Sequence, residues 1–277
     1  MTQTLKPVIE VPFGATDTHI HVYDDSPLSP TALSTPPPAA SVDDYRRIRA
    51  QLGLTRTVIV QPSVYGTDNA CTVRGIAALG PDVARGVAVV DAHVSEAELD
   101  RLTRAGMRGA RFFMLPGGAV GFDQLDAIAA KMAPFGWHAV FQTDGRRLAD
   151  HEAQIRAWPV PVIIDHTGKF LEPVAVDSPE FRVLLGLVET GRVFVKVSAP
   201  YETSKTGAPA YEDVSRLARA LVKAAPERIL WASNWPHPGR DPRPDSAHLL
   251  DILADWAPDP ADRKRILVDN PAGLYGF

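Results

Sequence analysis

The segment ATDTHIHV (15–22) has the length and the β-branched, apolar composition of one buried strand. Seven more segments of this kind follow along the chain, and a longer segment with helical spacing separates each from the next. Near-continuous apolar runs are typical of strands that are covered on both faces. The predicted strands are ATDTHIHV (15–22), TRTVIVQ (55–61), ARGVAVV (84–90), MRGARFF (107–113), WHAVFQT (137–143), PVPVIID (159–165), GRVFVKVS (191–198) and RILWAS (228–233).

The helical segments carry their own start and stop signals. Ser41 is the predicted N-cap of SVDDYRRIRAQLG, and Ser95 with Glu98 forms a predicted capping box. Pro179 lies in the first turn of SPEFRVLLGLVETG, and Gly191 follows its end. Eight strand–helix units predict an α/β fold, a single (β/α)8 TIM barrel. A doubly wound open sheet is the alternative, and the absence of a glycine fingerprint after the first strand disfavours it.

The predicted barrel fills residues 1–277 as one domain, with a proline-rich insertion near its start. Residues 26–45, SPLSPTALSTPPPAASVDDY, are too rich in proline for regular secondary structure. Their position after the first strand predicts a loop over the barrel mouth. The prediction includes a barrel that is locally distorted.

Composition narrows the class of function. The 277 residues are 45% hydrophobic and 22% charged, with a net charge of -4, which is ordinary for a globular protein. Neither this charge nor any run of Lys and Arg supports a nucleic-acid or membrane partner. The chain has no signal-peptide pattern, and its single cysteine, Cys71, excludes an internal disulfide. We therefore expect a cytoplasmic protein with a small-molecule substrate; the sequence leaves its oligomeric state open.

Polar residues at the carboxyl ends of barrel strands face one common site. His19 and His21 lie two residues apart on the first strand, so both can face the barrel axis. A lone strand-end histidine is more often structural, but burying two imidazoles side by side is costly unless they are used. Together with His166 after the sixth strand, they predict a functional site. Asn234 ends the eighth strand, and the candidate substrate-binding residues are Gln61, Arg111, Gln142, Lys196, Ser198, Tyr201 and His237.

Simpler roles compete at several of these positions. Arg108 and Arg111 are three residues apart along one strand and face opposite ways, so at most one points into the barrel. Lys196 could be a snorkelling lysine, and Tyr201 is equally suited to loop packing. No Gly-x-Ser-x-Gly elbow or phosphate-binding loop is present, which leaves the three histidines as the main chemical signal.

Six motifs along nearly the full length resemble the amidohydrolase superfamily, in particular its lactonase branch. They are TDTHIHVYD, STPPPA, VQPSVYGTDN, MRGARF, IIDHTGK and ASNWPHP. This branch includes enzymes that hydrolyse a pyrone dicarboxylate or sugar-acid lactones, and one that isomerises a sugar-acid lactone. The resemblance implies that His19, His21 and His166 polarise a lactone carbonyl at the barrel mouth.

The chain departs from the family pattern at two positions. Many relatives bind zinc through the strand-one and strand-six histidines and a lysine at the end of strand four, where this chain reads RFFMLP. The strand-eight aspartate that activates water in most relatives is Asn234, and an amide is not a base. We therefore expect no cofactor; a divalent metal such as zinc, if present, would be held by His19, His21 and His166.

The amide at position 234 leaves the reaction open. Transfer of an acyl group from one hydroxyl of a substrate to another works with a weaker base than attack by water, because the attacking hydroxyl is tethered to the carbonyl. Asn234 could then orient that hydroxyl or donate to the carbonyl oxygen. Hydrolysis with His237 or Asp165 as base stays open, as do a zinc-dependent hydrolase or decarboxylase of the same fold and a non-catalytic binding relative.

Overall fold

The computed structural model describes residues 6–30 and 39–277, and it contains eight parallel strands in the order β1 to β8. An isolated bridge between Ile20 and Trp235 joins the first strand to the segment after the last and closes the sheet into a barrel. The predicted (β/α)8 barrel is thus confirmed. The strands are β1 (Thr16–Ile20), β2 (Arg56–Val60), β3 (Ala84–Ala88), β4 (Met107–Phe113), β5 (His138–Gln142), β6 (Val162–Ile164), β7 (Val193–Ser198) and β8 (Ile229–Ala232).

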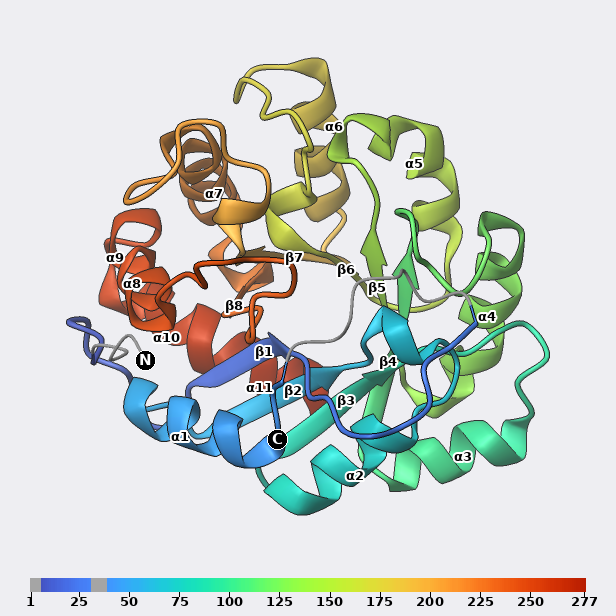
Figure 1. Ribbon diagram of the computed structural model, residues 1–277. Coiled ribbons are helices and arrows are strands. Elements are labelled where there is room, and N and C mark those ends of the chain that lie inside the picture. The colour runs from blue at the N-terminus through green and yellow to red at the C-terminus, as the bar shows by residue number, and fades with distance from the viewer. Residues whose placement is uncertain (1–5, 31–38) are drawn as a thin grey trace.

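Helices form the outer layer of the barrel (Figure 1). Ser41 and Ser95 cap their helices as predicted, and Pro179 begins another. The Glu98 carboxylate bonds to Arg101, so the predicted capping box at Ser95 is present only in its Ser95 half. No helix in the described ranges is long and apolar enough to cross a membrane. The helices are α1 (Val42–Leu52), α2 (Ala70–Leu79), α3 (Glu96–Arg104), α4 (Leu125–Met132), α5 (Leu148–Ala157), α6 (Pro179–Val188), α7 (Glu212–Ala224), α8 (Ser246–Asp251), α9 (Leu253–Trp256), α10 (Pro260–Lys264) and α11 (Asn270–Tyr275).

Alternation along the strands divides the core into two layers. On β2, Val58 and Val60 belong to a small inner cluster, whereas Ile59 between them packs in the larger cluster that includes the helices. The same alternation turns His19 of β1 inward. The strand β6 is shorter than the predicted 159–165 because Pro159 and Pro161 have no N–H to donate to a neighbouring strand.

The proline-rich insertion is described only at its two ends. Within 26–30 no regular secondary structure forms, as predicted, and helix α1 begins at Val42, inside the predicted loop. The prolines at 36–38 lie outside the described residues, so the prediction that this loop covers the mouth stays a prediction.

Candidate active site

Backbone hydrogen bonds between β1 and the end of β8 place an amide beside two histidines. The N–H of Asn234 donates to the carbonyl of His19 over 3.0 Å, and the N–H of His21 donates to the carbonyl of Trp235 over 2.8 Å. These bonds continue the barrel ladder past the last regular strand. Side chains that lie far apart in the sequence are therefore fixed at one point of the mouth.

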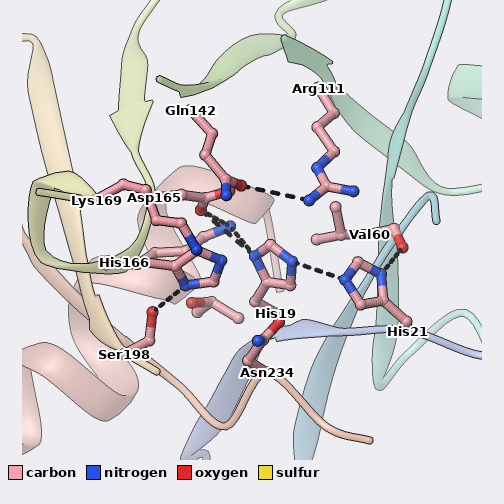
Figure 2. Close-up of polar contacts among 12 residues, drawn as sticks. His19, His21, Val60, Arg111, Gln142, Asp165, His166, Lys169, Ser198 and Asn234 are labelled. Carbon is pink, nitrogen blue, oxygen red and sulfur yellow. Dashed lines mark hydrogen bonds and ion pairs between the residues drawn. The ribbon is translucent and has the colours of Figure 1, made fainter. Parts of the chain in front are cut away.

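A chain of contacts determines where the protons of His19 and His21 lie (Figure 2). His21 Nδ1 lies 2.8 Å from the Val60 carbonyl and must donate to it, so a neutral His21 has its lone pair on Nε2. His19 Nε2 lies 3.3 Å from that atom and therefore carries the proton. His19 Nδ1 is then an acceptor for the Lys196 ammonium, 3.3 Å away. At rest, the Nε2–H of His19 donates to Nε2 of His21, so these two ring nitrogens are paired with each other.

Burial keeps these imidazoles neutral. It lowers the pKa of His21 to about 3, with a further contribution from the positive charge of Arg111. Burial also holds the pKa of His19 and of His166 well below the usual range, although Asp165 opposes the shift in both. Neutral histidines can accept and donate protons, which is what ester chemistry requires of them.

The residues after β6 complete the cluster. The His166 ring centre lies 5.0 Å from that of His19, and its Nδ1 contacts Ser198 Oγ at 2.9 Å. Asp165 Oδ1 lies 3.1 Å from Lys196 Nζ, and both side chains are fully buried. Burial raises the pKa of Asp165, but Lys196 and His19 outweigh it, so the carboxyl stays ionised. The predicted convergence of His19, His21 and His166 is present.

A strained turn presents His166 and Lys169 to the site. The four residues from His166 to Lys169 all have positive φ, with values of 50°, 55°, 86° and 51°. Asn234 has φ 58°, also left-handed. A non-glycine residue in this region costs about 1–3 kcal/mol, and such strain is concentrated at functional sites. The strain supports a functional role for this part of the mouth.

The side chains surround a cavity of about 180 Å³. Drug-sized ligands fill about 300–1,000 Å³, so this cavity suits a compact substrate. Arg111 reaches it from β4 and donates to Gln142 Oε1 over 3.3 Å, whereas Arg108 bonds to backbone carbonyls outside the barrel. One arginine faces inward, as predicted. The predicted residues that line the cavity are His21, Arg111, Gln142, His166 and Asn234.

The other predicted site residues support this lining. The Gln61 amide donates to loop carbonyls of Gly66 and Asp68, and Tyr201 Oη contacts His237 Nδ1 at 2.9 Å. His19, Gln61, Lys196, Ser198, Tyr201 and His237 are buried behind the cavity wall.

Two charged residues were missed as site residues by sequence reasoning. Lys169 and Glu202 both line the cavity, and their side chains form an ion pair with each other. Lys169 belongs to the IIDHTGK motif, which was a usable signal. Glu202 follows β7 in a loop, and no sequence pattern indicates that its carboxylate turns toward Asn234.

Three residues of the histidine cluster have the donor atoms of a metal site. His19, Asp165 and His166 bring donor atoms within 4.8 Å of one another, so the group could hold an ion; it contains Asp165 instead of the predicted His21. However, the Lys196 ammonium contacts both His19 Nδ1 and Asp165 Oδ1. In this arrangement the ammonium is paired with two of the three donors, so a divalent ion bound there would have to displace it.

Comparisons with known proteins show what the whole chain is similar to. The family model described as "Amidohydrolase" matches residues 16–277. The chain is 38% identical to D-galactarolactone isomerase of Agrobacterium fabrum, over 95% of this chain and 91% of the relative. It is 37% identical to 2-pyrone-4,6-dicarbaxylate hydrolase of Comamonas testosteroni, over 98% and 92%. An apo crystal structure from Agrobacterium tumefaciens superposes with TM-score 0.92 at 36% identity, covering 98% of both chains.

Proposed function

The chain belongs to the amidohydrolase family, and from that premise we propose that it is an enzyme acting on the ester of a small sugar-acid or carboxylate lactone. The observation that carries the proposal is a cluster of three neutral imidazoles, of which His21 and His166 line one compact cavity and His19 lies behind them in contact with both. Relatives at 38% and 37% identity are a lactone isomerase and a pyrone-dicarboxylate hydrolase by name, which supports the substrate class.

We assign the polarisation of the lactone carbonyl to the histidines. His166 lines the cavity, and when its Nδ1 accepts from Ser198 Oγ its Nε2–H is a donor that can stabilise the negative charge developing on the carbonyl oxygen. His19 acts from behind the cavity wall, where its Nε2–H donates to His21. Arg111 lines the cavity, and its guanidinium would pair with a substrate carboxylate.

Isomerisation is the favoured reaction, and hydrolysis the second candidate. A tethered hydroxyl can gain about 7–11 kcal/mol over a free nucleophile in favourable cases, so it reacts with a weaker base than water requires. Both amide hydrogens of Asn234 are used by Tyr201 Oη and Glu202 Oε1, each at 3.0 Å, so Asn234 offers the substrate its oxygen and not a donor. This supports the orienting role over donation to the carbonyl.

Substitution of the three histidines tests the proposal. His19→Ala, His21→Ala and His166→Ala should each lower kcat on a turned-over lactone by about 100-fold or more, because losing one group that stabilises the developing oxyanion costs about 10²–10³ in kcat. Proton NMR with a panel of γ- and δ-lactones separates ring migration from hydrolysis by product. Wild-type rates in all three folded variants would contradict the assignment.

The same panel addresses the alternatives. Stoichiometric zinc that is lost together with activity on chelation would favour the zinc-dependent hydrolase or decarboxylase. Ligand binding without turnover of any lactone would favour the non-catalytic relative.

A further inference from the structure

We propose that Glu202 is the carboxylate that takes and returns the proton in the lactone reaction, in place of a carboxylate at the end of β8. This inference deepens the proposed function and rests on it. Glu202 is the one acidic residue among the described residues that line the cavity. Its side chain is 16% exposed, so it is partly buried yet open to the cavity.

The other carboxylates near the site, and His237, are committed elsewhere. Asp165 lies behind the cavity wall and is paired with Lys196. Asp17 is fully buried and accepts hydrogen bonds from Ser233. His237 uses both ring nitrogens, one with Tyr201 Oη and one with Ser246 Oγ, each at 2.9 Å. The two bases that the sequence left open for hydrolysis, His237 and Asp165, therefore do not face the substrate.

The position of Glu202 gives a physical reason for the amide at position 234. Asn234 Nδ2 donates to Glu202 Oε1 over 3.0 Å, so the amide holds the carboxylate in place. An aspartate at position 234 would set two carboxylates at about that separation, where like charges cannot both ionise. Asparagine at 234 is thus the partner of a carboxylate supplied from the loop after β7.

Lys169 pairs with the second oxygen of Glu202. The Lys169 side chain is 10% exposed, and the nearby ammonium favours the ionised form of the carboxylate. An ion-paired carboxylate is a weaker base than a free one. That agrees with a tethered substrate hydroxyl as the nucleophile.

In the proposed step the proton moves only between the substrate and Glu202. The attacking hydroxyl oxygen forms a bond to the lactone carbonyl carbon while its proton passes to Glu202. The resulting tetrahedral intermediate collapses, the bond from that carbon to the old ring oxygen breaks, and Glu202 returns the proton to this oxygen. If water replaces the hydroxyl, the same transfers produce the open hydroxy acid. The step needs no oxidant or reductant.

The test combines removal of the carboxylate with its relocation. Glu202→Gln should lower kcat by about 100-fold or more, with KM changed less than threefold. Adding Asn234→Asp to this variant should recover at least tenfold of the loss, because the carboxylate then lies at the end of β8 and no longer faces a second one. Glu172→Gln is the control, since Glu172 is exposed and pairs with Lys205 outside the site.

Each result has a distinct meaning. A Glu202→Gln enzyme within threefold of wild type overturns the inference while lactone activity stands. A loss that neither Asn234→Asp nor the conservative Glu202→Asp restores, in variants that melt like wild type, assigns Glu202 a structural role and also overturns it. If the wild-type protein turns over no lactone, the proposed function itself fails.

Discussion

At the scale of single residues, the charge of Lys169 makes activity depend on pH. Burial lowers the Lys169 pKa to about 8, although the negative charge of Asp165 opposes the shift. As pH rises through 8, the folded protein loses this proton and with it the ion pair that holds Glu202. We expect kcat to fall above pH 8, and in Lys169→Arg this fall should move to higher pH because a guanidinium stays charged.

The measurement is a pH–rate profile between pH 6 and 10. Lys205→Arg is the matched control, because Lys205 forms an exposed ion pair with Glu172. An alkaline limb at the same pH in the wild type and in Lys169→Arg would show that another group titrates.

The residues that converge on the site were predictable to different degrees. His19 and His21 could be assigned from their spacing on one strand, and Asn234 from its place at a strand end. The pairing of Lys169 with Glu202 could not be predicted. It depends on a left-handed turn after β6 and on the path of the loop after β7, and neither has a periodicity that sequence can show.

At the scale of elements, the turn from His166 to Lys169 depends on Gly168. Its φ is +86°, and an added Cβ would lie 2.6 Å from Phe170 Cε2 and 2.8 Å from Leu184 Cδ2. Gly168→Ala should therefore combine backbone strain with overpacking and cost about 2–4 kcal/mol. Thermal melts should show the loss as a lower Tm, with reduced kcat because His166 shifts.

Gly136→Ala separates the two effects in this experiment. Gly136 has a similar φ of +67°, but a Cβ there meets nothing within 4 Å. Gly136→Ala should therefore lose stability only through backbone strain. A fall in Tm equal to that of Gly168→Ala would contradict the packing argument.

At the scale of the whole molecule, the barrel was predictable because eight strand-sized runs alternate with capped helices. Its closure was not, because no sequence pattern states how β1 meets β8. The structure closes with the bridge from Ile20 to Trp235 and with a buried carboxyl, Asp17, which accepts from Ser233 N–H over 3.0 Å and from Ser233 Oγ over 2.5 Å. Tyr45 Oη of α1 lies 3.3 Å from the same carboxyl.

This closing carboxyl should make the stability of the barrel depend on pH. Burial raises the pKa of Asp17 to about 6, although hydrogen bonds from Ser233 oppose the shift. The folded state keeps its proton up to about pH 6, whereas the unfolded chain loses it near 3.8, so the folded state binds more protons in between. The free energy of unfolding should therefore fall by about 3 kcal/mol from pH 4 to pH 6 through this group and stay level above. Urea unfolding measures the free energy of unfolding of wild type and of Asp17→Asn across this range, and the difference between the two gives the contribution of Asp17. If both proteins show the same dependence on pH, Asp17 is not its cause.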